Sequence, residues 1–253
     1  MKKLTVISGW ASDSLACQEV RTAAQGFLRE PTLIDISFVS STPSTIHTGF
    51  LVRQVVETEE RYGRPLETVI LQDADPLLEP NAELLILRLR SGIHVLGPNV
   101  GYGFSFLHDK IDVAFTYPGM NKEGQFRSRD LYARIAAHLM EAREDEMALE
   151  EAHLSMIPRT QDDYIGHIDS LGNMKTTIKK SIFEEKHAFG DTVDIEIGST
   201  MHTATYHKNL FTESDQELVI YPGSSGDSHD PFLEISASER FDKARSGMKV
   251  LIT

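Results

Sequence analysis

Residues Tyr164–Ile178 place an acid and an amide in a polar turn between two apolar runs. The sequence of this segment, YIGHIDSLGNMKTTI, predicts a strand, a tight turn and a second strand, because turn-forming residues fill its centre. Asp169 and Asn173 are four residues apart, so the turn can present a carboxylate and an amide to a ligand. The alternative is that both residue types occupy the turn for local backbone reasons.

Two further positions combine reactive side chains with a predicted element boundary. Asp73 and Asp75 follow the apolar run at 68–72, where a predicted strand ends. The alternative is that these acids cap the next segment. Ser128 precedes a helical pattern, and Phe126 lies two residues before it. The serine hydroxyl can either bind a ligand or act as the N-cap of the helix.

The first half of the chain has the pattern of an α/β domain. Apolar runs at 4–8, 32–38 and 68–72 predict strands, and helical spacing follows at 12–27 and 45–62. This alternation predicts a mainly parallel sheet. Runs at 84–89 and 93–96, separated by Ser91-Gly92, suggest a hairpin or two more strands. A strand at 111–115 and a helix at 131–147 complete the predicted domain, which we bound at residues 1–157.

The second half has a different pattern, with short strand-like runs and hardly any helical spacing. The runs fall at 164–168, 174–178, 192–197, 202–206, 217–221, 232–236 and 248–252. Short strands at this spacing predict a small all-β, barrel-like domain, which we bound at residues 162–253.

Composition excludes several classes of protein. The net charge of −13 argues against nucleic-acid and anionic-membrane partners. The single cysteine, Cys17, excludes an internal disulfide and a cysteine-ligated zinc site, and the scattered histidines indicate no metal site. No stretch approaches the roughly 20 apolar residues of a membrane span. We therefore expect a cytoplasmic protein that acts on a small molecule.

Five collinear segments resemble one known family. The turn IDSLGNMKTTI is similar to the signature "IDxFGNxxTNI" of the S-adenosyl-L-methionine hydroxide adenosyltransferases, which include the fluorinases and chlorinases. The segments PTLIDISFVSSTP, LGPNVG, FRSRD and LVIYPGSSGD resemble further family blocks in the same order. The resemblance covers almost the whole chain and implies the same two-domain architecture, α/β followed by all-β.

The resemblance implies a reaction and a set of site residues. Family members cleave S-adenosyl-L-methionine by attack of water or halide at ribose C5′, with methionine as the leaving group and without a metal or an organic cofactor. Ser128 and Phe126 match the residues beside the nucleophile. Asp75 or Asp73 is the possible counterpart of a water-activating acid, and we take Asp75 as the candidate catalytic residue. The implied substrate-binding positions are Trp10, Asp13, Asn99, Asp169, Asn173, Ser224 and Ser225. The resemblance also implies a homotrimer, with the ligand between domains of neighbouring subunits.

The chain departs from the family at three of its blocks. The opening "DFG", whose Asp holds the ribose, is replaced by Gly9-Trp10-Ala11, with Asp13 as a possible substitute. The loop "VDPGVGxxxR" is absent, and Arg127 stands where water-using members have His. Two alternatives therefore stay open. One is a binding protein for adenosine or S-adenosyl-L-methionine without turnover, and the other is an enzyme of this fold with a different ligand.

Overall fold

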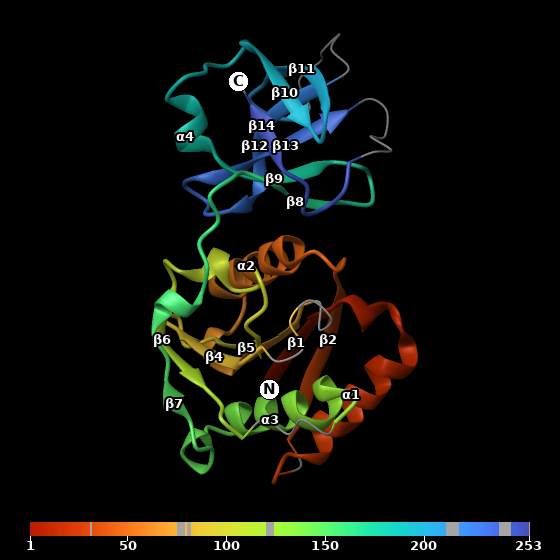
Figure 1. The fold of residues 1–253 in the computed structure, drawn as a ribbon, viewed down its shortest axis with the longest axis vertical. Helices are drawn as coiled ribbons and strands as arrows, with labels where there is room; N and C mark the ends of the chain where they lie inside the picture. Colours follow the sequence, from red (N-terminus) through yellow and green to blue (C-terminus); the bar gives the residue numbers. More distant parts are fainter. Residues whose placement is uncertain are drawn as a thin grey trace. The chain divides into compact units, whose positions relative to one another are not determined.

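The computed structural model describes residues 1–30, 32–74, 79, 82–119, 124–210, 218–237 and 244–252. The chain forms two compact units, Met1–Arg159 and Thr160–Thr253 (Figure 1). Each unit has its own seven-stranded sheet and its own apolar core.

The sheet of the first unit is mixed. Its strands are β1 (Lys2–Ser8), β2 (Ile34–Ser40), β3 (Thr68–Asp73), β4 (Leu84–Leu89), β5 (His94–Pro98), β6 (Ile111–Thr116) and β7 (Glu150–Glu151), in the order β2-β1-β3-β5-β4-β6-β7. Strands β2, β1, β3 and β5 are parallel, whereas β4, β6 and β7 run antiparallel to their neighbours. The predicted mainly parallel sheet is therefore not confirmed. The cause is the tight turn at Ser91-Gly92, where Gly92 has φ +89° and reverses the chain into the β4–β5 hairpin.

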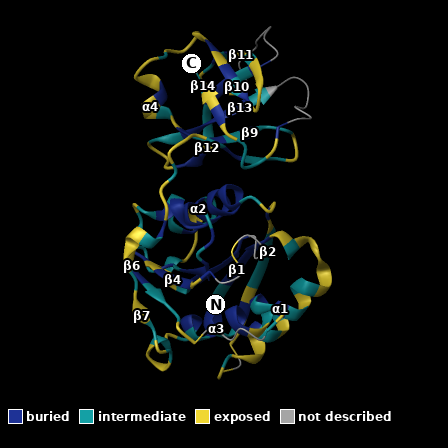
Figure 2. Cartoon of the chain, viewed as in Figure 1, coloured by how far each residue is buried: buried dark blue, intermediate teal, exposed yellow. Residues whose placement is uncertain are grey.

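Helices cover both faces of this sheet. Helices α1 (Ser14–Gly26) and α3 (Ala133–Met140) pack together over one face, and α2 (Thr45–Tyr62) packs on the other. The buried residues of α2 and of the central strands form a continuous layer in Figure 2. The predicted helix at 131–147 is wrong beyond Met140, because the chain leaves the helix at Glu141 and Ala142 takes φ +52°.

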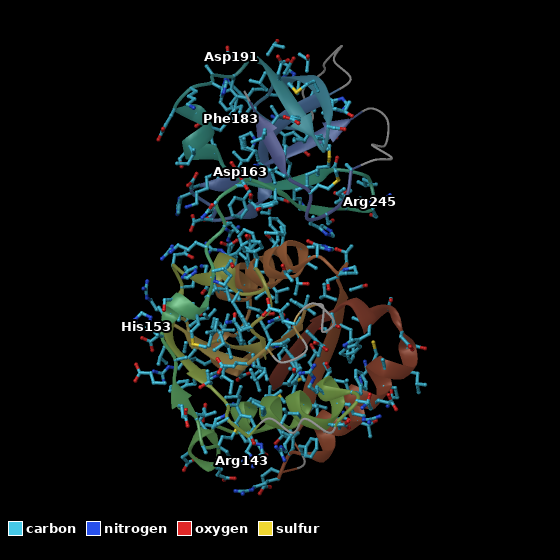
Figure 3. The ribbon with its side chains drawn as sticks, viewed as in Figure 1. Arg143, His153, Asp163, Phe183, Asp191 and Arg245 are labelled. Carbon is cyan, nitrogen blue, oxygen red and sulfur yellow. The ribbon has the colours of Figure 1, made fainter. Side chains whose placement is uncertain are left out.

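The second unit is a sheet that nearly closes into a barrel. Its strands are β8 (Ile165–Ile168), β9 (Met174–Lys179), β10 (Thr192–Ile197), β11 (Thr200–Tyr206), β12 (Leu218–Gly226), β13 (Pro231–Ala237) and β14 (Val250–Ile252), in the order β14-β10-β11-β12-β13-β9-β8. Backbone hydrogen bonds from Ile165 N to Met248 O and from Val250 N to Asp163 O join its two edges. A short helix, α4 (Lys180–Glu184), adds Phe183 to the core (Figure 3). Each of the seven strand-like runs predicted from the sequence overlaps one of these strands.

None of the helices in the described part of the chain is both long enough and apolar enough to cross a bilayer.

Candidate functional site

The strand order of the first unit creates a switch point at the carboxyl ends of β1 and β3. From β1 the chain crosses through α1 to β2 on one side, and from β2 it crosses through α2 to β3 on the other side. Ser8 and Asp73, the last residues of β1 and β3, are register partners. In open α/β sheets the crevice at such a switch point is where ligands bind.

Side chains from three separate segments, those of Trp10, Asp73 and Ser128, meet at this point. The Oδ2 of Asp73 accepts a hydrogen bond from Trp10 Nε1 at 3.0 Å and a short one from Ser128 Oγ. Trp10 lies in the 3₁₀ turn directly after β1, and Ser128 opens the segment that leads into α3. Asp73 is 7% exposed and Ser128 is fully buried. A carboxylate and a hydroxyl therefore meet where little water reaches them.

Burial controls the ionisation of this cluster. It raises the pKa of Asp73, and the hydrogen bonds from Ser128 and Trp10 and the charge of Arg127 offset only part of that effect. Burial, together with the nearby Asp73 carboxylate, also raises the pKa of Tyr132 to about 12. A carboxyl group whose pKa is raised is a stronger proton acceptor once it is ionised.

Aromatic rings surround Trp10. Phe126 meets it edge-on at 5.3 Å between ring centroids, and Phe38 does so at 6.2 Å. The guanidinium groups of Arg21 and Arg129 lie over the rings of Phe38 and Phe126, at 5.2 and 5.5 Å. Half-buried aromatic faces thus border the buried carboxylate.

A π-helical turn, Ser128–Tyr132, brings Ser128 to Asp73. Such single wide turns frequently occur at functional sites, because the extra residue changes the direction of nearby side chains. Ser128 makes no N-cap hydrogen bond, so the capping interpretation is wrong and its hydroxyl serves Asp73 instead.

The other candidates of the first unit have structural partners or lie outside the description. Asp13 is the N-cap of α1, where its Oδ1 accepts from Leu15 N at 2.8 Å and from Ala16 N at 3.4 Å. The Nδ2 of Asn99 donates to the carbonyl of Met156 at 2.9 Å. Asp75 falls outside the described residues. Among those described, no group of three or more His, Cys, Asp and Glu side chains is arranged to hold a metal ion.

In the second unit, the Asp169 turn is closed by its own side chains. Asp169 Oδ1 accepts from Leu171 N at 2.9 Å and Asn173 N at 3.0 Å, and Oδ2 accepts from Asn173 Nδ2 at 3.0 Å. Burial raises the pKa of Asp169, but these bonds and the charge of Lys175 outweigh it and hold the pKa below its usual value. The local interpretation of this turn therefore accounts for the hydrogen bonds that Asp169 accepts.

A second buried carboxylate, Glu234 on β13, organises the neighbouring strands. Its Oε1 accepts from Lys175 Nζ at 2.7 Å and from the backbone N and Oγ of Ser224 at 2.7 and 2.9 Å. Tyr221 donates to Oε2 at 3.3 Å. Gly223 gives Glu234 its space, because a Cβ there would lie 2.4 Å from Glu234 Cγ.

The two candidate serines of this unit have different environments. Ser224 is bound to Glu234 and also accepts from Lys175 Nζ at 2.8 Å. Ser225 is fully buried, and its Oγ has no hydrogen-bond partner in the described residues. Glu234 was not among the candidates predicted from sequence. Its signal was an acid flanked by Leu233 and Ile235 inside a strand-like run.

Comparison with known proteins supports the fold only. No protein-family model and no curated protein match the chain. An uncharacterized conserved protein from Thermotoga maritima has a similar structure, with a TM-score of 0.77, 16% identity, and coverage of 99% of this chain and 100% of the other. A conserved hypothetical protein from Thermus thermophilus is also similar, with a TM-score of 0.70, 17% identity and coverage of 100% of both chains.

Proposed function

We propose that this protein is a divergent S-adenosyl-L-methionine-cleaving enzyme in which water attacks ribose C5′ and methionine leaves. The observation that carries the proposal is the buried carboxylate of Asp73, bound to Trp10 and Ser128 at the switch point of the sheet. The identity of the substrate is inferred from the collinear sequence segments. The Asp73 cluster provides a carboxylate that is able to take the proton of the attacking water.

The proposed step needs one base and no metal. The water oxygen forms a bond to C5′ while the C5′–S bond breaks, and the electron pair stays on sulfur as the thioether of methionine. One proton of the water passes to the Asp73 carboxylate and then to solvent, so the products are adenosine, methionine and one proton. A sulfonium is a good leaving group, and the main task is to hold the water in line behind C5′ at about 3–3.5 Å.

The hydrogen bonds of the cluster favour water over halide. Ser128 and Trp10 both donate to Asp73, so those protons are not available to a halide ion. A halide also needs donors and is repelled by an ionised carboxylate, whereas water can donate to it. Water is therefore the nucleophile that this arrangement fits.

The half-buried rings beside Asp73 suit a cationic substrate. Aromatic faces attract cations, and the quaternary ammonium ligands of aromatic cages illustrate the strength of that attraction. Arg21 and Arg129 already lie over Phe38 and Phe126, so a sulfonium would gain from the ring of Trp10 and from the Asp73 charge. The resemblance further implies a homotrimer, whose mass can be measured by analytical ultracentrifugation.

One observation favours a different function. Asp169 and Asn173, the residues expected to hold methionine and adenine, bond to each other and to their own turn. Asp13, the expected substitute for the ribose acid, caps α1. These contacts favour an enzyme of this fold with another ligand as the rival proposal. A protein that binds adenosine or S-adenosyl-L-methionine without turnover is the other alternative.

Incubation with S-adenosyl-L-methionine in ¹⁸O-water separates these alternatives. We expect chromatography to resolve methionine and adenosine, and mass spectrometry to find the label at the 5′ oxygen of adenosine. Calorimetric binding without products would support the binding protein. Neither binding nor products would mean that the ligand is a different compound.

A further inference from the structure

A pocket beside α3 has the composition of a binding site for a small organic acid. Its volume is about 350 Å³, near the lower end of the range for small-molecule sites. It is lined by Tyr117, Arg134, Ile135, His138, Glu146 and Met147, together with Gly119 and Ala148. None of these residues belongs to the Asp73 cluster.

Arg134 is the cation of this pocket. It is half-buried, and its Nη2 donates to the hydroxyl of Tyr117 at 3.2 Å. Within the described residues, no carboxylate forms an ion pair with Arg134. A guanidinium has several N–H donors in a planar fork that matches a carboxylate, so most of them remain available for a ligand.

His138 adds an acceptor one helical turn farther along α3. Its Nδ1 lies 2.9 Å from the carbonyl oxygen of Arg134. A carbonyl only accepts, so Nδ1 carries the proton and Nε2 of the neutral ring is an acceptor. Residues four apart on a helix are separated by about 6 Å along its axis, which fits a carboxylate and a hydroxyl at opposite ends of one small molecule.

The one acid in the pocket lining does not oppose an anionic ligand. Glu146 is bound by Arg29 through two hydrogen bonds of 2.7 Å and by Arg143 at 3.3 Å. Arg143 lies just beyond the end of α3 (Figure 3). Two arginines bind Glu146, so among the described residues of the lining Arg134 is the charge left to face a ligand.

The remaining lining is apolar. Ile135 is 1% exposed and belongs to the core of the first unit, and Met147 packs against that core. Between Arg134 and His138 a ligand therefore meets carbon atoms, which favours an apolar body over a fully polar one.

We propose that this pocket binds a small carboxylic acid with an apolar body and a hydroxyl group. The carboxylate pairs with Arg134 and Tyr117, the body lies on Ile135 and Met147, and the hydroxyl donates to His138. The inference does not depend on the activity proposed for Asp73.

The test uses 4-hydroxyphenylacetate and the intact protein, without S-adenosyl-L-methionine. With ¹³C-labelled methyl groups, we expect titration to shift the NMR signals of Ile135 and Met147. The uncharged 4-hydroxyphenylacetamide should bind about tenfold more weakly or worse, because it lacks the charge-assisted bonds. Phenylacetate, which lacks the hydroxyl, should lose a smaller factor.

Two variants test the residues. Arg134→Gln should weaken binding by about tenfold or more, while Arg61→Gln, a matched change on the exposed end of α2, should not. Ala148 is an exposed lining residue, so Ala148→Trp should fill the pocket and abolish binding without removing a charged side chain. This variant keeps the test decisive even if Arg134→Gln fails to fold. Equal affinity for acid and amide, unchanged affinity in Ala148→Trp, or shifts confined to other methyl groups would overturn the proposal.

Discussion

Asp73 in the first unit and Glu234 in the second are both buried carboxylates, and their electrostatics are opposite. Asp73 is 7% exposed and Glu234 is 5% exposed, so both have lost most of their water. Asp73 accepts hydrogen bonds from the neutral side chains of Trp10 and Ser128, and burial raises its pKa. Burial also acts on Glu234, but the ammonium of Lys175 and the donors of Ser224 outweigh it and lower the pKa.

The difference separates a structural acid from a reactive one. A buried carboxylate that is paired with a cation stays ionised and ties strands together. A buried carboxylate with neutral donors is poised to take a proton, and such groups cluster at functional sites. Asp73 also lies at the switch point of the sheet, whereas Glu234 lies within β13. The proposed function therefore uses Asp73 as the reactive acid, and we expect Glu234 to contribute to stability.

The largest effect should come from Asp73→Asn. The amide cannot accept the proton of the attacking water, so we expect methionine release to slow by about 10²- to 10⁴-fold. The raised pKa means that the fold favours the protonated carboxyl, and this contribution is lost as pH rises through the folded-state pKa. Because the neutral amide resembles the protonated form, thermal unfolding at neutral pH should occur no earlier than in the wild type.

The matched control is Asp112→Asn. Asp112 is an exposed acid of the same sheet that pairs with Arg88 at 2.9 Å, and its loss should leave the rate unchanged. Turnover at the wild-type rate in Asp73→Asn would remove Asp73 as the base.

The next effect is on stability and comes from Glu234→Gln. This change leaves the Lys175 ammonium, which is 18% exposed, without its counter-charge. We expect the free energy of unfolding in urea to fall by about 3 kcal/mol at neutral pH. The stability that Glu234 contributes is present above its unfolded pKa and lost as pH falls through its lowered pKa, so the deficit should shrink in acid.

A double variant shows whether the deficit comes from the unpaired charge. Lys175→Met combined with Glu234→Gln should recover part of the lost stability, because no buried charge remains. Asp162→Asn, which breaks an exposed pair with Lys249, should change nothing measurable. A denaturation midpoint in Glu234→Gln equal to that of the wild type would contradict the structural role of this acid.

Much of the fold was predictable from local patterns. Apolar runs indicated the strands of both units, because strand spacing depends on neighbouring residues. The mixed sheet of the first unit was not predictable in the same way, because strand order and direction depend on how each connection places the next strand in the sheet. The length of α3 was also misjudged, because the residues after Met140 keep a helical composition while Ala142 takes a left-handed backbone.

The candidate site shows the same limit. Trp10, Phe126 and Ser128 were found through short motifs, and the structure brings them together. Sequence alone does not separate Asp73 from Asp75, because only the position of Asp73 at the end of β3, at the switch point, distinguishes it. Glu234 had only the weak signal of an acid inside an apolar run, since its partners Lys175 and Ser224 come from strands far apart in the sequence.

The smallest effect, and the sharpest test of the neutral donors, is that of Trp10→Phe. Phenylalanine keeps a ring against Phe38 and Phe126 but loses the Nε1 hydrogen bond of 3.0 Å to Asp73. That bond lowers the pKa of Asp73, so its removal should raise the pKa further. Activity that needs ionised Asp73 falls as pH falls through this pKa, so the acidic limb of the pH–rate profile should move to higher pH with the plateau rate retained.

Direct ¹³C NMR titration of the Asp73 carboxyl gives the pKa of Asp73 without turnover. The control is Phe38→Leu, which leaves the hydrogen bond from Trp10 in place. An unmoved carboxyl titration in Trp10→Phe would mean that Trp10 only packs against its neighbours and that the difference between Asp73 and Glu234 has another origin.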